Sequence, residues 1–137
     1  FVGGVSGNAG LFSTTHDLAV IFQMLLDRGI CGDRRYLSRA TCDLFMGMKA
    51  KNSRRGLGFD KPDIESDDNS PCAPEAPASV FGHTGFTGTC VWVDPDNELV
   101  FVFLSNRTYP VAFGHDNLMK LDIRSRIQQA MYQSIIY

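Results

Sequence analysis

His83, Thr84 and Gly85 are the residues of this sequence whose types and spacing best suit chemistry. They stand in a run punctuated by glycines and bring together an imidazole, a hydroxyl and a position without a side chain. An imidazole changes charge near neutral pH, and a glycine in a strand lets another backbone approach closely. The triplet is therefore a candidate site. On the residues alone, the alternative is a strand histidine that is hydrogen-bonded only to its neighbours.

The other residues of reactive type form no ligand cluster in the sequence. His16 and His115 have no partner at the spacing of metal ligands and are interpreted as surface residues. The cysteines are Cys31, Cys42, Cys72 and Cys90. They show no Cys-x-x-Cys spacing, so we expect no metal and no cofactor. Cys42 and Cys90 are interpreted as small buried residues, whereas Cys72, in a polar loop, could oxidise. The sequence leaves disulfide pairing open.

Two strand-like runs follow the triplet and must position it. Residues 89–93 are rich in β-branched and aromatic side chains, and residues 99–104 form a continuous apolar run. Between them, residues 94–97 read Asp-Pro-Asp-Asn, a composition typical of tight turns, so the sequence predicts a β-hairpin. We expect the triplet on a strand beside this hairpin. Because an all-apolar strand is usually covered on both faces, helices should pack on the sheet.

Helical periodicity precedes the triplet. Thr14 is predicted to cap a first helix that ends near Gly29. Its buried face is expected to comprise Leu18, Ile21, Phe22 and Leu25. A second helix is predicted from Ser38 to about Gly47, and residues 56–59 are expected to form a short strand.

A C-terminal helix is predicted to begin near Asp122 and to pack on the sheet. Its expected packing stripe is Ile123, Ile127, Ala130, Met131 and Ser134, and Gln128 is expected on the wet side. Residues 60–79 contain four prolines and several acidic residues, so they are predicted to form a surface loop. The predicted fold class is α+β: an antiparallel sheet, made of the His-Thr-Gly strand and the β-hairpin, with packed helices that include a C-terminal one.

The run from Gly82 to Thr89, with the hairpin and its exit from Leu104 to Pro110, resembles the serine β-lactamase and penicillin-binding-protein superfamily. The class C-like branch, with its D-alanyl-D-alanine peptidase and esterase relatives, is the most similar part of it. In that family the third motif is Lys-Thr-Gly or His-Thr-Gly, on the strand that lines the active site. The resemblance implies a partial β-lactamase-like fold and acyl transfer through a serine.

The resemblance also implies roles for the triplet and its neighbour. His83 would replace the lysine that supplies positive or hydrogen-bonding character. Thr84 would offer its hydroxyl to a substrate carboxylate or carbonyl, and Gly85 would admit the substrate backbone. The backbone N–H of Phe86 would be one of two oxyanion-hole donors.

Other parts of the family's site are less complete in this sequence. Asn106 and Arg107 resemble positions that touch substrate carboxylates. The alternative interpretation is that they are polar residues at the end of a strand and lie in solvent. The family's nucleophile is a serine in Ser-x-x-Lys, and no serine in this sequence has a lysine three positions further on. Because a serine needs a base within reach, we expect this chain alone to be inactive.

Composition bounds the domain organisation and the partners. The 137 residues, 44% hydrophobic with a net charge of −2, suit one globular unit and give no basis for nucleic-acid binding. No apolar run approaches the roughly 18 residues of a membrane span. Because the sequence starts at Phe1 inside a glycine-rich loop, we interpret residues 1–137 as a single C-terminal fragment of a β-lactamase-like domain. The resemblance alone suggests an extracytoplasmic or periplasmic location.

Two functions remain open from the sequence. The first is the C-terminal portion of a serine hydrolase whose parent cleaves an amide or ester, with a small-molecule or peptide substrate. The alternative is a non-catalytic penicillin-recognising module that binds cell wall or glycan or joins other domains. Because open sheet edges invite pairing, we also expect the chain to self-associate.

Overall fold

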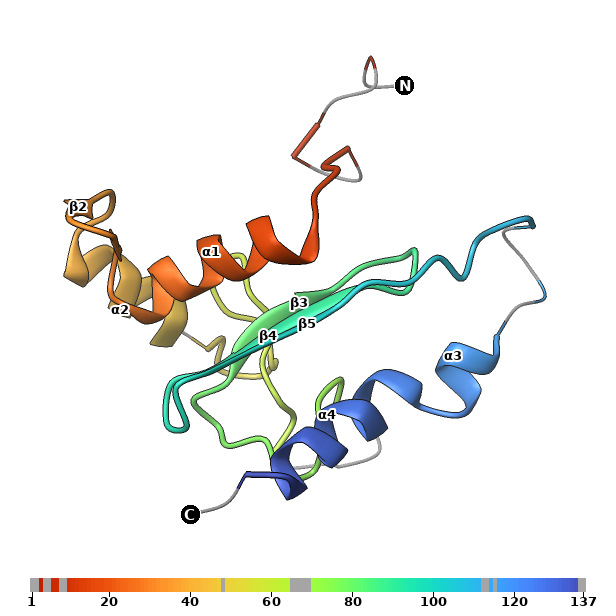
Figure 1. The fold of residues 1–137 in the computed structure, drawn as a ribbon. Helices are drawn as coiled ribbons and strands as arrows, with labels where there is room; N and C mark the ends of the chain where they lie inside the picture. The colour runs from red at the N-terminus through yellow and green to blue at the C-terminus, as the bar shows by residue number, and fades with distance from the viewer. Residues whose placement is uncertain are drawn as a thin grey trace.

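The computed structural model describes residues 3, 6–7, 10–47, 49–64, 70–111, 114 and 116–135. The helices are α1 (Thr15–Leu26), α2 (Arg39–Gly47), α3 (Asn117–Lys120) and α4 (Ile123–Gln133). The strands are β1 (Ile30–Cys31), β2 (Arg34–Arg35), β3 (Phe81–Thr84), β4 (Cys90–Asp94) and β5 (Leu99–Phe103). Helix α1 lies on one side of the three-stranded sheet and α4 on the other (Figure 1). The predicted α+β class with packed helices is confirmed.

The larger sheet has the strand order β3-β4-β5, with both pairs antiparallel. His83 pairs with Val91 and Trp92 with Phe101, so the predicted hairpin and the strand beside it are both present. The central strand β4 is buried along its whole length, whereas β5 is an edge strand and only partly buried. The apolar run 99–104 nevertheless packs on both faces, because Phe101 and Phe103 lie on the α4 side and Val100 on the α1 side.

Alternation along the strands divides the core into two clusters. Phe81 and Val93 point toward α1 and α2, where they pack with Cys42 and Met46. The second cluster faces α4 and comprises Cys72, Ala76, Val80, Cys90, Trp92 and Phe101. Because neighbouring strand residues face opposite sides, Cys90 and Trp92 of β4 enter one cluster and Val93 enters the other.

The carboxylate of Asp94 organises the hairpin turn. It is 2% exposed and accepts hydrogen bonds from the backbone N–H of Asp96 (2.9 Å) and from Asn97 Nδ2 (2.8 Å). Tyr132 Oη, from α4, donates to the same carboxylate at 2.8 Å. Burial, followed by this hydrogen bond, raises the pKa of the Tyr132 hydroxyl. The turn is thus closed by an aspartate side chain, as its composition predicts.

Helix α1 begins as the sequence predicts, but its buried face is shifted. Thr14 Oγ1 accepts from the N–H of Asp17 at 3.2 Å, which confirms the N-cap. Phe22, Leu25 and Leu26 pack against the core, whereas Ile21, expected to be buried, is 50% exposed. Helix α2 is confirmed, and Ser38 Oγ caps it by accepting from the N–H of Thr41 at 3.0 Å.

Helix α4 packs through a face that is shifted from the predicted apolar stripe, although Met131 of that stripe does pack against the core. Ser125 and Gln128 are its buried residues, while Ile127 is 42% exposed. The physical reason is hydrogen bonding, because both polar side chains satisfy the backbone of residues 72–73. Gln128 Oε1 accepts from the N–H of Ala73 at 2.9 Å, so this glutamine is not on the wet side.

The segment predicted as a surface loop, residues 60–79, is partly core. Among its described residues, Cys72 and Ala73 are 2% exposed and Lys61 is 4% exposed. Cys72 is buried against Cys90, and burial raises the pKa of both thiols, that of Cys90 to about 11, so Cys72 is not the exposed thiol we expected. All four cysteines are free.

The local structure around residues 30–60 also departs from the prediction. Residues 56–59 form no strand; instead Asp60 makes an isolated bridge to Gly82. The short β1–β2 hairpin and α3 were not predicted. None of the helices among the described residues has the length and apolar character needed to cross a membrane.

Candidate functional site

The triplet lies where β3 ends and a tight turn begins. His83 and Thr84 are the last two residues of β3, and Gly85 follows the strand directly. The N–H of Gly85 donates to Thr89 O at 2.7 Å, and the N–H of Gly88 donates to Gly85 O at 3.0 Å. Residues 86 and 87 are therefore the central residues of a turn that connects β3 to β4.

The outer edge of β3 is covered at one end and open at the other. Because the N–H of Gly85 donates to Thr89, the residue before β4, alternation directs the backbone groups of Gly82 and Thr84 away from β4. Asp60 covers Gly82 through two backbone hydrogen bonds, of 2.7 and 3.1 Å. Beyond that bridge, the N–H of Phe86 donates to no other residue in the described part of the chain. This donor is free to meet a ligand.

Gly85 lies against a side chain of its own turn. A Cβ at this position would collide with Oγ1 of Thr89, so no other residue fits without moving that side chain. The close contact that favours glycine here is therefore with Thr89 of the same chain. Its proposed role in admitting a substrate backbone has no contact in this chain that tests it.

Arg107 lies against the turn that carries the Phe86 N–H. Its Nε donates to Phe86 O at 2.7 Å, its backbone N–H donates to Thr87 O at 2.9 Å, and its guanidinium lies 4.5 Å from the centre of the Phe86 ring. Asn106 is exposed, and its Oδ1 accepts from Oγ1 of Thr108 at 2.9 Å. The structure thus brings Arg107 to the triplet's turn, while Asn106 contacts its own loop.

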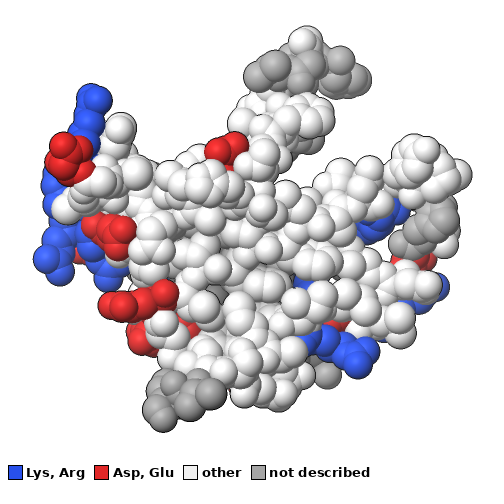
Figure 2. Space-filling model, in the orientation of Figure 1, with Lys and Arg blue, Asp and Glu red and all other residues white. Residues whose placement is uncertain are grey.

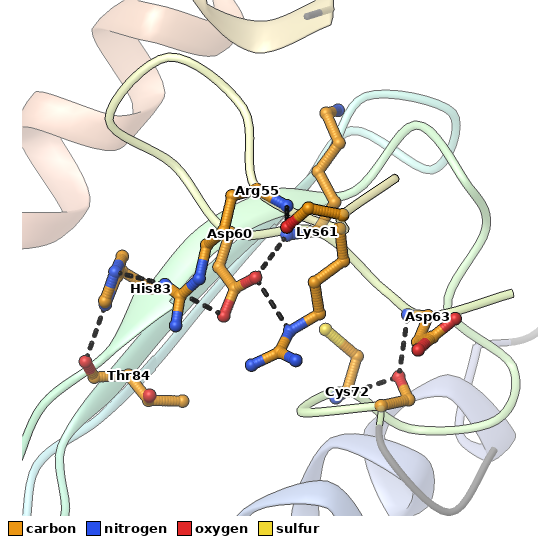
Figure 3. A network of polar contacts seen from close by, with 10 residues as sticks. Arg55, Asp60, Lys61, Asp63, Cys72, His83 and Thr84 are labelled. Atoms are coloured by element: carbon orange, nitrogen blue, oxygen red, sulfur yellow. Dashed lines mark hydrogen bonds and ion pairs between the residues drawn. The ribbon is translucent and has the colours of Figure 1, made fainter. Parts of the chain in front are cut away.

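His83 is exposed, yet both of its ring nitrogens have partners in the chain. Nδ1 lies 2.7 Å from Thr84 O, and Nε2 lies 2.7 Å from Nη1 of Arg55. Figure 3 shows the Arg55 side chain between the His83 ring and the Asp60 carboxylate. The imidazole is therefore part of a polar network that also contains Arg55 and Asp60.

Asp60 holds two arginines in that network. Arg54 Nε lies 2.9 Å from Oδ1 of Asp60, and Arg55 Nη1 lies 3.3 Å from Oδ2. Both are ion pairs by distance, but neither has the alignment of a hydrogen bond. The carboxylate is 1% exposed, so its charge is screened mainly by these two cations. Sequence reasoning missed all three residues, and their only signal was an Arg-Arg pair shortly before an acidic residue.

The candidate site is an open strand edge, and both signs of charge occur around it. Two cavities, of about 320 and about 270 Å³, both include Pro95 and lie at the hairpin-turn end of the sheet, away from the triplet. Both signs of charge are present on the face shown in Figure 2, with no field of a single sign. Among the described residues, no group of three potential ligands is placed to hold a metal ion. What the geometry offers is hydrogen-bond donors and a cation beside an open strand edge.

Comparisons with known proteins agree with this geometry. The β-lactamase family model matches residues 1–123. A protein of Escherichia coli O157:H7 named "Putative D-alanyl-D-alanine carboxypeptidase" is 39% identical over 121 residues, 85% of this chain and 27% of that protein. A protein of the same name from Salmonella gallinarum is 39% identical over 116 residues, 81% of this chain and 26% of that protein.

A solved structure shows the same fold. The crystal structure of a β-lactamase from Mycobacterium bovis matches with a TM-score of 0.66 at 24% identity, over 88% of this chain and 44% of that one. The chain spans about a quarter of the length of the curated relatives it matches. Since the family model covers nine-tenths of the sequence, residues 1–123 of 137, the chain belongs to the β-lactamase family.

Proposed function

We propose that this chain is the C-terminal portion of a serine hydrolase, in which it forms one wall of an acyl-transfer site. In the whole protein, a serine Oγ attacks the carbonyl carbon of an amide or ester and its proton passes to a base. The amine or alcohol then leaves with a proton, and water releases the acid from the acyl-serine. The relatives' names favour a peptide substrate that ends in D-alanyl-D-alanine.

The free N–H of Phe86 is the observation that carries this proposal. It follows an exposed strand end, and neither the turn nor the ladder uses it among the described residues. A backbone N–H held in a rigid turn is a pre-organised donor for the oxygen that becomes negative during acyl transfer. Arg107 supports its position by bonding Phe86 O and Thr87 O from the other side of the turn.

The remaining residues of the wall bind the substrate. Thr84, the last residue of β3, comes two positions before this donor, and Arg55 and His83 add a polar edge on the strand side. The nucleophile and its base come from outside this sequence, because no Ser-x-x-Lys occurs in it. The chain alone is therefore inactive, and the full-length natural protein that contains it is active.

Substitution of Phe86 by proline tests the donor directly. Proline has no N–H, so Phe86→Pro in the full-length protein removes one oxyanion-hole donor and lowers kcat by about 100- to 1000-fold. The readout is hydrolysis of nitrocefin, a p-nitrophenyl ester and a D-alanyl-D-alanine peptide. Phe86→Ala is the matched control, because it loses the same ring and keeps the N–H.

Three outcomes would reject the proposal. Equal losses in the proline and alanine variants would mean that the N–H has no catalytic role. Turnover by residues 1–137 alone would contradict the assignment of the nucleophile to another part of the protein. An intact protein without Ser-x-x-Lys and without hydrolysis, but with affinity for peptidoglycan, would favour the non-catalytic module instead.

A further inference from the structure

Lys61 is a buried charged side chain for which the described part of the chain supplies no partner. It is 4% exposed, and its only hydrogen bond to a described residue runs from its backbone N–H to Oδ1 of Asp60, at 3.1 Å. No ion pair among the described residues includes its Nζ. Figure 3 shows the side chain extending away from the Asp60 carboxylate. Because a buried ammonium without an acceptor is costly, a ligand that supplied one would recover part of that cost.

The Lys61 side chain lines a cavity of about 270 Å³ at the hairpin-turn end of the sheet. The cavity lies between the end of α2, residues 78–79 and the turn that joins β4 to β5. None of the described residues that line it belongs to the triplet or to the turn after β3. Pockets for drug-sized ligands measure about 300 to 1000 Å³, so this cavity suits a smaller molecule.

The charges around the cavity favour an anion on the side of Lys61. The carboxylate of Asp43, which also lines the cavity, is shared by two arginines. Its Oδ1 lies 2.8 Å from Nε of Arg28, and its Oδ2 lies 3.7 Å from Nε of Arg39. Burial, followed by the charge of Lys49, lowers the pKa of the Lys61 amine. This carboxylate is therefore already neutralised, and the nearest charge that acts on Lys61 is another cation.

The remaining wall limits the size and charge of that anion. Asp96 lines the cavity without a cation of its own among the described residues, and its Oδ2 accepts from Ser79 Oγ at 2.8 Å. It would repel a ligand that carried two negative charges. Met46, which is 4% exposed, and Pro95 add apolar surface. The lining thus matches a single negative charge on a short apolar body.

We propose that this cavity binds a small organic monocarboxylate, and that the Lys61 ammonium donates to its oxygens while Met46 and Pro95 contact its apolar part. An ammonium has three donors, and a hydrogen bond between two ions is among the strong ones. The site is distinct from the acyl-transfer wall and does not depend on the proposed function. It gives the charge of Lys61, which the chain itself leaves uncompensated, a partner.

The test follows the Met46 methyl group in the full-length natural protein. In carbon–proton correlation spectra of protein labelled with 13C-methyl methionine, the signal lost in Met46→Leu identifies this residue. We expect sodium propionate to shift that signal saturably. Propionamide, which has nearly the same shape and no charge, should leave it in place. Lys61→Met should weaken propionate binding by about 10- to 100-fold.

Two variants separate a bound ligand from a general effect of charge. Lys51→Met removes a lysine at an exposed position and should leave propionate binding unchanged. Asp96→Asn removes the opposing charge and keeps an oxygen for Ser79, so it should strengthen binding by about two- to fivefold. The other methionine methyl signals show whether each variant is folded.

Three results would overturn this inference. They are no saturable shift of the Met46 signal, an equal shift with propionamide, and propionate binding that survives in Lys61→Met. Inorganic phosphate that bound more tightly than propionate would contradict the choice of a monocarboxylate. None of these results bears on hydrolysis, so the proposed function stands or falls separately.

Discussion

Buried polar side chains in this chain hold the backbone of distant segments. Gln128 accepts from the N–H of Ala73, Ser125 Oγ donates to Cys72 O, and Asp94 gathers the hairpin turn. All three side chains are 4% exposed or less. Buried N–H and C=O groups need hydrogen-bond partners. These polar side chains are therefore buried because they supply such partners, although their own polarity favours exposure to water.

Lys61 is a buried residue whose charge works against the fold. It is 4% exposed, and burial, followed by the charge of Lys49, lowers its pKa from the ordinary value of 10.5. The charged form is thus less favourable in the folded chain than in the unfolded one. The resulting loss of stability is complete below the folded-state pKa and disappears as the pH rises toward 10.5.

Replacing Lys61 by methionine should therefore stabilise the chain near neutral pH. We expect Lys61→Met to raise the free energy of unfolding at pH 7 by about 1 kcal/mol. The wild type should approach the variant as the pH rises toward 10.5. Urea unfolding across this pH range measures both effects. Lys51→Met, at an exposed position, is the control, and an identical response in both variants would argue against the burial explanation.

At the scale of elements, the sequence predicts best where the signal is local. The hairpin, the N-caps of α1 and α2 and the strand of the triplet depend on neighbouring residues, and all are present. The packed faces of α1 and α4 depend on what lies opposite, so periodicity alone misplaced Ile21 and Gln128. Apolar spacing could not reveal that residues 72–73 need hydrogen-bond partners from α4.

The same distinction applies to the candidate site. His83, Thr84 and Gly85 are contiguous, so a motif can reveal them. Arg55 reaches His83 across 28 residues of sequence, and its position depends on the bridge between residues 60 and 82. The sequence predicts a strand at 56–59 instead, which would place the arginine differently. Only folding brings the cation and the imidazole together.

Helix α4 offers a direct test of which face is buried. Gln128→Leu adds an apolar side chain but leaves the N–H of Ala73 without its acceptor. We expect it to lower the free energy of unfolding by about 1 to 3 kcal/mol. Ile127→Gln, on the 42% exposed face, should change it by no more than about 0.5 kcal/mol. Urea unfolding measures both, and the reverse ranking would show that the apolar stripe is the packed face after all.

For the whole molecule, the edge of the sheet at β5 is the feature best suited to pairing with another chain. The hydrogen-bond pattern of β3 and β4 directs the backbone groups of Cys90, Trp92 and Asp94 toward β5. Their partners are Phe103, Phe101 and Leu99, so Val100 and Val102 point their N–H and C=O groups away from the sheet. Figure 2 shows few charged side chains in the middle of the face between α1 and α4 that would discourage pairing.

We therefore predict that the 137-residue chain self-associates through β5 and that Val102→Pro abolishes this. Proline removes the outward N–H without breaking a bond to β4, because Val102 belongs to a non-hydrogen-bonded pair with Val91.

Sedimentation velocity over a hundredfold concentration range should show a concentration-dependent dimer for the wild type and a monomer for the variant. Val102→Thr, which keeps the N–H, should associate like the wild type, and circular dichroism should confirm that both variants are folded. A wild-type chain that remains monomeric at the highest concentration would mean that the open edge is protected, and association of the proline variant would place the contact on another surface.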